Sequence, residues 1–202
     1  MKKNYSELFE KMHIAGKLAA KTLDELTPFV KPGVTTNFLD KICYEYIKDH
    51  GGNSAPLYYR GFPKSCCTST NHTVCHGIPS EKILEDGDIM NVDVTTFIDG
   101  HHGDTGRMFC IGDVSVKSKN LISATYVSMM EGISIIKPGI KLGDIGATIQ
   151  DYVESKEFSV VKDFCGHGIG TVFHKPPNVL HYGNKNSGIT LKSGMIFTIE
   201  PM

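Results

Sequence analysis

Residues 91–109 read NVDVTTFIDGHHGDTGRMF, two strand-like runs joined by Asp99-Gly100. An Asp-Gly pair between two such runs is a strong signal for a β-hairpin with a two-residue loop. That loop places Thr95 opposite Asp104. Because side chains alternate along a strand, Asp93 shares the face of Thr95 and lies about 7–8 Å from Asp104, measured between Cα atoms. The stretch therefore predicts an antiparallel hairpin with two carboxylates on one face.

The carboxylate of Asp93 stands in an apolar run, IMNVDVTTF, where packing alone gives no reason for a charge. Burying two carboxylates together is unfavourable unless a cation such as a divalent metal ion binds them. For an aspartate in the turn-like sequences DG and GDTGR, a solvated turn residue is the alternative.

A unit of two helices followed by strands occurs twice in the chain. Apolar spacings of three and four predict helices over residues 6–26, 36–49 and 120–136, with a fourth helix carrying Ile145, Ile149, Tyr152 and Val153. VKPGV at 30–34 returns as IKPGI at 136–140, and LEDGDIMNVDV at 84–94 returns as LKSGMIFTIEP at 191–201. The two copies, about 6–110 and 118–202, predict one α+β domain with pseudo-two-fold symmetry and a mainly antiparallel sheet.

The second copy adds two further candidate metal ligands. His167 lies in the glycine-rich DFCGHGIG, aligned with His76 of CHGIP, and Glu200 aligns with Asp93. Two aspartates, a histidine and a glutamate form a mostly oxygen ligand set with one nitrogen. Such a set suits a Mn, Fe, Co or Zn ion and differs from the cysteine-rich set of a structural zinc site. Two-metal hydrolases use such ligands to activate a water and polarise a carbonyl.

The chain ends with GMIFTIEPM, residues 194–202. A second-copy equivalent of Asp104 falls near position 211, beyond the last residue. We therefore expect a domain truncated at its C-terminal end, which lacks a return strand and at least one metal ligand. The strand of Glu200 would then be an exposed edge, and the chain would be less stable than a longer form.

Composition narrows the function classes. The chain has 202 residues, 40% hydrophobic and 21% charged, with a formal net charge of −1, which argues against a nucleic-acid-binding surface. No run approaches the ~18 apolar residues of a membrane span, and the first residues lack a signal-peptide pattern, so we expect a cytoplasmic protein. Its six cysteines form no CxxC pair.

Four stretches resemble the methionine aminopeptidases, and their wording is closest to the type I branch: GFPKSCCTSTNHTVCHGIP (61–79), NVDVTTFIDGHHGDTGRMF (91–109), CGHGIGTVFHKPPNVLHY (165–182) and GMIFTIEPM (194–202). The resemblance covers essentially the whole chain. It implies the pita-bread α+β fold and removal of the initiator methionine from nascent polypeptides, with the ribosome as a candidate place of action. It also implies two divalent metal ions among Co, Mn, Fe and Zn, and a monomer.

The same resemblance assigns roles to individual residues. It implies four metal ligands, Asp93, Asp104, His167 and Glu200, whereas the family's fifth ligand, a bridging glutamate on the return strand, has no counterpart. Glu200 matches the general base, His76 the histidine that contacts the scissile amide, and His174 the one that stabilises the tetrahedral intermediate. The methionine pocket matches Tyr59, Phe62, Cys67 and Phe173, and Pro56 stands where other members carry a cysteine.

The residues alone are compatible with more than one interpretation. A lone histidine is more often structural, and we interpret His13, His50, His72, His101, His102 and His181 in that way. Phe62 and Phe173 are equally compatible with an ordinary core. Proline-specific peptidases share the implied fold, but TVCHGIP and CGHGIGTVFH match the methionine enzymes more closely. Two further interpretations are a catalytically impaired fragment and a non-catalytic binding module. Against both, every ligand position that the chain reaches carries a residue able to bind a metal.

Overall fold

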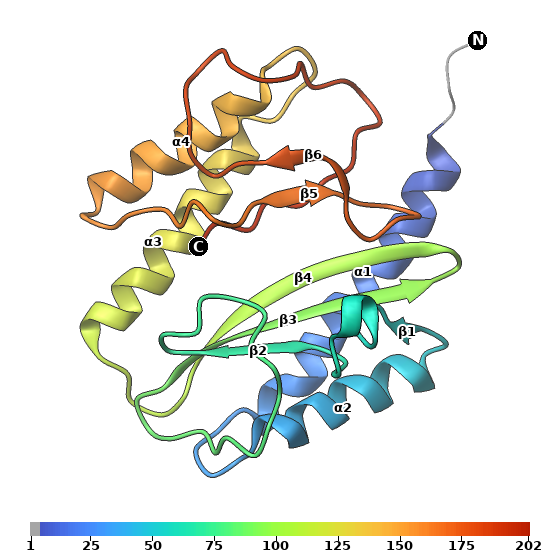
Figure 1. Ribbon diagram of the computed structural model, residues 1–202, viewed down its shortest axis with the longest axis vertical. Helices are drawn as coiled ribbons and strands as arrows, with labels where there is room; N and C mark the ends of the chain where they lie inside the picture. The colour runs from blue at the N-terminus through green and yellow to red at the C-terminus, as the bar shows by residue number, and fades with distance from the viewer. Residues whose placement is uncertain (1–4) are drawn as a thin grey trace. The chain divides into compact units, whose positions relative to one another are not determined.

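The computed structural model describes residues 5–202, and contacts within the chain divide it into two units (Figure 1). The first unit comprises the chain up to Ser115 together with Gly170–Val172. The second comprises Val116–Ile169 and Phe173–Met202. Both units combine helices with antiparallel strands, which confirms the predicted α+β class.

The first unit packs two helices against a four-stranded antiparallel sheet. Its helices are α1 (Ser6–Leu26) and α2 (Thr36–Asp49), as predicted, with short 3₁₀ turns η1 (Thr27–Phe29) and η2 (Tyr59–Gly61). Its strands are β1 (Asn53–Ser54), β2 (Cys67–Thr70), β3 (Ile89–Ile98) and β4 (His101–Cys110). Strand β3 pairs with β4 along one side and with β1 and β2 along the other. Helix α1 packs across β3 and β4, and α2 packs against α1 and β1.

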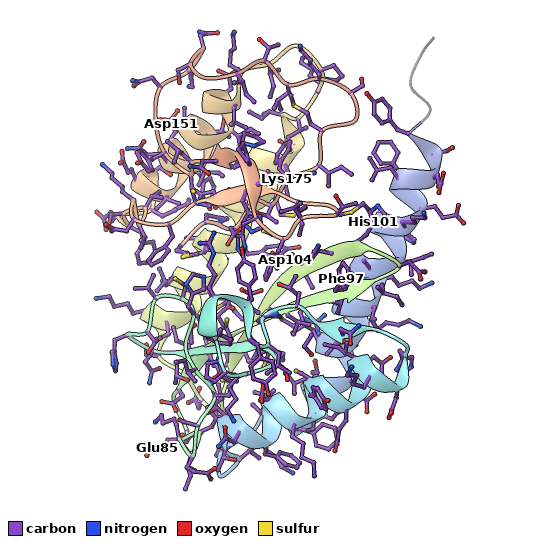
Figure 2. The ribbon with its side chains drawn as sticks, turned by 45° about the vertical axis from the view of Figure 1, so that its right-hand side comes forward. Glu85, Phe97, His101, Asp104, Asp151 and Lys175 are labelled. Carbon is purple, nitrogen blue, oxygen red and sulfur yellow. The ribbon has the colours of Figure 1, made fainter. Side chains whose placement is uncertain are left out.

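The hairpin of β3 and β4 has the predicted register. Thr95 pairs with Asp104, and Ile98 with His101. Asp99 and Gly100 at the turn both have positive φ, 50° and 75°, as a type I′ turn requires. Figure 2 shows His101 near this turn and Asp104 further along the hairpin.

Helix α1 and strand β4 approach so closely that their backbones touch. A Cβ atom placed on Gly103 of β4 would lie 2.2 Å from the carbonyl carbon of Ala15 in α1. On the neighbouring strand, Thr96 Oγ1 donates a hydrogen bond of 2.8 Å to the Ala15 carbonyl. The core beside this contact is aliphatic and includes Leu23, Leu39, Met90, Val92, Val94 and Ile111. Glycine at position 103 therefore allows the helix to lie this close to the sheet.

The second unit contains helices α3 (Val116–Ser134) and α4 (Leu142–Ser155) and strands β5 (Gly166–Gly168) and β6 (Lys175–Val179). The sequence predicted the third helix over 120–136, so it begins four residues earlier and ends two residues earlier than expected. Pro138 favours an end at Ser134, because proline has no N–H to donate to the carbonyl four residues before it and its ring clashes with that carbonyl. The helices of residues 5–202 all lack the combination of length and hydropathy needed to cross a membrane.

The two units contain equivalent backbone pairings. In the first, Gly33 N–H donates to the Leu84 carbonyl and Leu84 N–H donates to Val34, both at 2.8 Å. In the second, Gly139 N–H donates to the Leu191 carbonyl at 2.9 Å, and Leu191 N–H donates to Ile140 at 2.8 Å. Both glycines have positive φ, 88° and 100°. In both units the turn at the KPG sequence is therefore hydrogen-bonded to the backbone of a buried leucine.

The last residues, 194–202, differ from the sequence prediction of a strand carrying Glu200. They pair with β5 and the residue after it through one bridge, Gly168 with Phe197. Two backbone hydrogen bonds flank it, from Thr198 N–H to the His167 carbonyl at 2.8 Å and from Ile169 N–H to the Ile196 carbonyl at 3.2 Å. Strand β5 has only three residues, so a long regular ladder cannot extend along it.

Candidate active site

Two predicted metal ligands lie on the hairpin of the first unit. Asp104 Oδ1 accepts a hydrogen bond of 3.0 Å from the Oγ1 of Thr95, the buried residue opposite it. Asp93 lies on the same face, two residues before Thr95, and is paired with Cys67 of β2 and Gly106 of β4. The structure therefore places both carboxylates on the predicted face.

The carboxylates on this face affect the pKa of the neighbouring Cys67 thiol. Burial raises its pKa, and the negative charges of Asp93 and Asp104 raise it further. The thiol is therefore protonated at neutral pH, and both carboxylates lie close enough to act on it. A protonated, buried thiol behaves as a small polarisable apolar group, which suits the wall of a side-chain pocket.

Two other predicted metal ligands meet in the second unit. His167 Nε2 lies 3.6 Å from Glu200 Oε1. The other ring nitrogen, Nδ1, is 3.2 Å from the Gly168 carbonyl, which can only accept, so Nδ1 carries the proton. In the neutral ring Nε2 then has its lone pair on the side of the Glu200 carboxylate, and this is the tautomer in which a histidine binds a metal through Nε2.

Thr198 orients this pair. Its Oγ1 donates to Glu200 Oε1 at 2.6 Å and accepts the His167 N–H at 2.9 Å. One hydroxyl therefore fixes a carboxylate oxygen and the backbone of the imidazole residue. Sequence reasoning missed Thr198, because residues 194–202 form no regular strand from which a face shared with Glu200 could be inferred.

His181 supports Glu200 from the interior. Its ring is 1% exposed, and its Nε2 accepts the Glu200 N–H at 3.0 Å. Burial lowers its pKa to about 4, so the ring is neutral and able to accept at neutral pH. The sequence alone favours a structural role for His181. It lies 19 positions before Glu200, too far along the chain for any local pattern to have indicated this contact.

Two further candidates lie beside His167. The rings of Phe173 and His174 stack with centroids 4.1 Å apart, and the His174 ring lies 4.1 Å from that of His167. Phe173 is buried, whereas His174 is exposed. The second unit thus gathers a buried aromatic ring, an accessible imidazole and two candidate metal ligands.

The remaining candidates lie in loops of the first unit. Tyr59 and Phe62 belong to one turn, closed by a hydrogen bond of 3.0 Å from Phe62 N–H to the Tyr59 carbonyl. The Arg60 guanidinium lies 5.4 Å from the centre of the Tyr59 ring. His76 is exposed and has a left-handed backbone, with φ of 54°.

Each unit therefore supplies two of the four predicted metal ligands. Within residues 5–202, no three His, Cys, Asp or Glu side chains gather closely enough to hold a metal ion. The donors in each unit nevertheless fit a divalent metal: Asp104 and Glu200 each have an oxygen oriented by a threonine hydroxyl, and His167 has its proton on Nδ1. Oxygen donors with one imidazole suit Mn, Fe, Co and Zn.

Comparison with known proteins gives consistent results. Residues 10–202 match metallopeptidase family M24. The methionine aminopeptidase of Rickettsia prowazekii (strain Madrid E) is 58% identical over 194 residues, which cover 96% of this chain and 75% of that protein. The methionine aminopeptidase of Escherichia coli (strain K12) is 51% identical over 198 residues, covering 97% and 75%.

Solved structures share the fold. The crystal structure of methionine aminopeptidase from Rickettsia prowazekii has a TM-score of 0.97 at 56% identity and covers 100% of this chain and 81% of that one. The Xaa-Pro dipeptidase from Bacillus anthracis has a TM-score of 0.83 at 23% identity, which shows a common fold alone. These similarities confirm the predicted pita-bread fold and the use of a divalent metal that the family implies. The chain belongs to metallopeptidase family M24, among its methionine aminopeptidases.

Proposed function

We propose that this protein removes the N-terminal methionine from nascent polypeptides and peptides, as a metal-dependent aminopeptidase. The identity of 58% to a methionine aminopeptidase over 96% of the chain carries the proposal. The structural support is that Asp93 and Asp104 lie on one face of the hairpin, where Thr95 orients Asp104, and that Thr198 orients Glu200 beside His167. We further propose that it acts in the cytoplasm as a monomer, on chains emerging from the ribosome.

Asp93, Asp104, His167 and Glu200 would hold two divalent ions, with Co, Mn, Fe and Zn as candidates. When bound, such ions supply an activated water and a polarised carbonyl. The chain's own contribution is orientation: Thr95 and Thr198 each fix one carboxylate oxygen, and the Gly168 carbonyl fixes the His167 tautomer.

Three residues would handle protons and developing charge. Glu200 would accept a proton as general base, with its carboxylate oriented by Thr198 and its backbone by His181. His76 would contact the scissile amide. His174 would donate to the oxygen that becomes negative, from a ring stacked on Phe173.

The methionine side chain would occupy a pocket formed by Tyr59, Phe62, Cys67 and Phe173. Aromatic rings and a protonated thiol suit a thioether, because sulfur–ring contacts are favourable. All four side chains would contact the methionine side chain, and none of them would act as a nucleophile.

The test is methionine release from the peptide Met-Ala-Ser, with Mn²⁺, Co²⁺, Fe²⁺ or Zn²⁺ added to metal-free protein. We expect activity that a chelator abolishes and a kcat that Glu200→Gln lowers by a factor of about 100 or more. Glu157→Gln, in an exposed turn outside the site, is the matched control and should leave kcat unchanged. Metal binding without any methionine release would reject the enzyme and favour a binding module.

A further inference from the structure

The loop between β2 and β3 folds back onto β2 at Gly77. Thr68 N–H donates to the Gly77 carbonyl at 2.8 Å, and Gly77 N–H donates to the Oγ of Ser69 at 3.1 Å. Both backbone groups of Gly77 are thus bonded to consecutive residues of β2. One of these two hydrogen bonds, from Gly77 N–H, depends on the side-chain hydroxyl of Ser69.

The attachment is a direct backbone contact. A Cβ atom on Gly77 would lie 2.1 Å from the Thr68 carbonyl oxygen, so the loop could not lie this close with any other residue at position 77. His76 immediately before it has φ of 54°, a region that residues with a Cβ rarely adopt. Such a conformation persists when its surroundings fix it.

Ser69 is placed to do this. It is 5% exposed on β2, and alternation puts its side chain on the face of Cys67, which is paired with Asp93. Burying a hydroxyl costs free energy unless the hydroxyl is hydrogen-bonded. The Gly77 N–H supplies that hydrogen bond to the Oγ of Ser69.

We infer that Ser69 is a positioning residue, which holds the Gly77 amide and thereby keeps His76 in the left-handed conformation that directs its ring. The inference rests on the proposed function for the role of His76 at the scissile amide. The backbone effect on His76 can be measured without that role.

The structure offers a matched control in the same sheet. Ser54 of β1 is also buried, at 8% exposed, and its Oγ has no hydrogen-bond partner among residues 5–202. Ser69→Ala and Ser54→Ala therefore remove the same atom from two buried strand positions, and the first alone removes a hydrogen bond. Ser69→Cys keeps the side chain close in size with only a weak acceptor, and gives the same test if Ser69→Ala does not fold.

The first readout is NMR of the full chain. In Ser69→Ala we expect the Gly77 amide to exchange about two- to ten-fold faster, the range that loss of one hydrogen bond predicts. The ¹³Cα and ¹³Cβ shifts of His76 should move away from left-handed values, and Ser54→Ala should change neither. Unchanged exchange and shifts in Ser69→Ala would overturn the inference.

The second readout is the kinetics of Met-Ala-Ser hydrolysis. We expect Ser69→Ala to lower kcat about two- to ten-fold with little change in KM, because a displaced His76 weakens the transition state more than peptide binding. Altered His76 shifts with an unchanged kcat would overturn the positioning role. If the unmodified chain releases no methionine, the proposed function fails, while the NMR shifts still decide whether Ser69 holds His76.

Discussion

At the scale of single residues, two threonine hydroxyls orient the candidate ligands. The Thr95–Asp104 contact follows from the sequence, because Asp99-Gly100 sets the register of the hairpin. The Glu200 contacts do not follow in the same way. His181 reaches the Glu200 N–H only through the tertiary fold, and residues 194–202 form no regular strand from which a face could be assigned.

Thr198→Val keeps the side-chain shape and removes the hydroxyl. We expect Mn²⁺ affinity, measured by calorimetry, to fall about 10-fold or more, since residues that orient metal ligands typically have effects of this size. Thr125→Val is the control, because the Thr125 hydroxyl donates to Leu121 within α3. Equal affinities in the two variants would show that Thr198 does not orient Glu200.

Asp88 should make stability depend on pH. Burial disfavours its charge, but hydrogen bonds from Glu85 N–H and Asn71 and the charge of Lys82 outweigh this and lower its pKa. The charged form therefore stabilises the fold above the ordinary aspartate pKa, and this stability is lost as the pH falls through the lowered value.

Asp88→Asn should cost about 1–3 kcal/mol in the free energy of unfolding at pH 7. The difference from the unmodified chain should shrink as the pH falls below the ordinary aspartate pKa, which urea unfolding at several pH values would measure. A difference independent of pH would mean that the charge is irrelevant.

At the scale of elements, helices α1 and α2 could be predicted residue for residue, because Pro28, Pro32 and Gly33 end the first pattern and Gly51 and Gly52 follow the second. The expected strand of Glu200 was wrong. The segment it pairs with, β5, has only three residues, and this is not visible in an apolar run such as MIFTI.

Gly103→Ala should destabilise the contact between β4 and α1. Its Cβ would meet the Ala15 backbone, so we expect a loss of about 1–3 kcal/mol or more in urea unfolding. Gly106→Ala in the same strand is the control, since its nearest neighbour would be the Asn91 side chain at 3.4 Å. Similar losses for both variants would indicate a strand-propensity effect.

Helix α4 depends on Asp144 at its start. One oxygen accepts the Asn186 N–H at 2.7 Å and the other the Lys141 N–H at 2.8 Å, and these bonds lower the Asp144 pKa. Asp151, labelled in Figure 2, makes an exposed ion pair of 3.0 Å with Lys185. We expect Asp144→Ala to lower the melting temperature at pH 7 more than Asp151→Ala, because exposed ion pairs contribute little. The reverse order would contradict this.

At the scale of the whole molecule, the equivalent turns of Gly33 onto Leu84 and Gly139 onto Leu191 correspond to the sequence repeat. What the repeat could not predict is that Gly170–Val172 belongs to the first unit. The Gly170 carbonyl lies 2.9 Å from the N–H of His102 and 2.8 Å from its Nδ1. A histidine interpreted from the sequence as structural thus holds a segment 68 residues away.

That segment bears on how the chain can be divided. A cut between Ser115 and Val116 follows the repeat, yet the first piece would lose the acceptor that His102 holds, because Gly170 would be on the other polypeptide. The halves are therefore not interchangeable modules. Shuffling one of them between relatives would transplant an incomplete part, and split-fragment reporters would do better with a boundary that keeps residues 170–172 in the same polypeptide as β4.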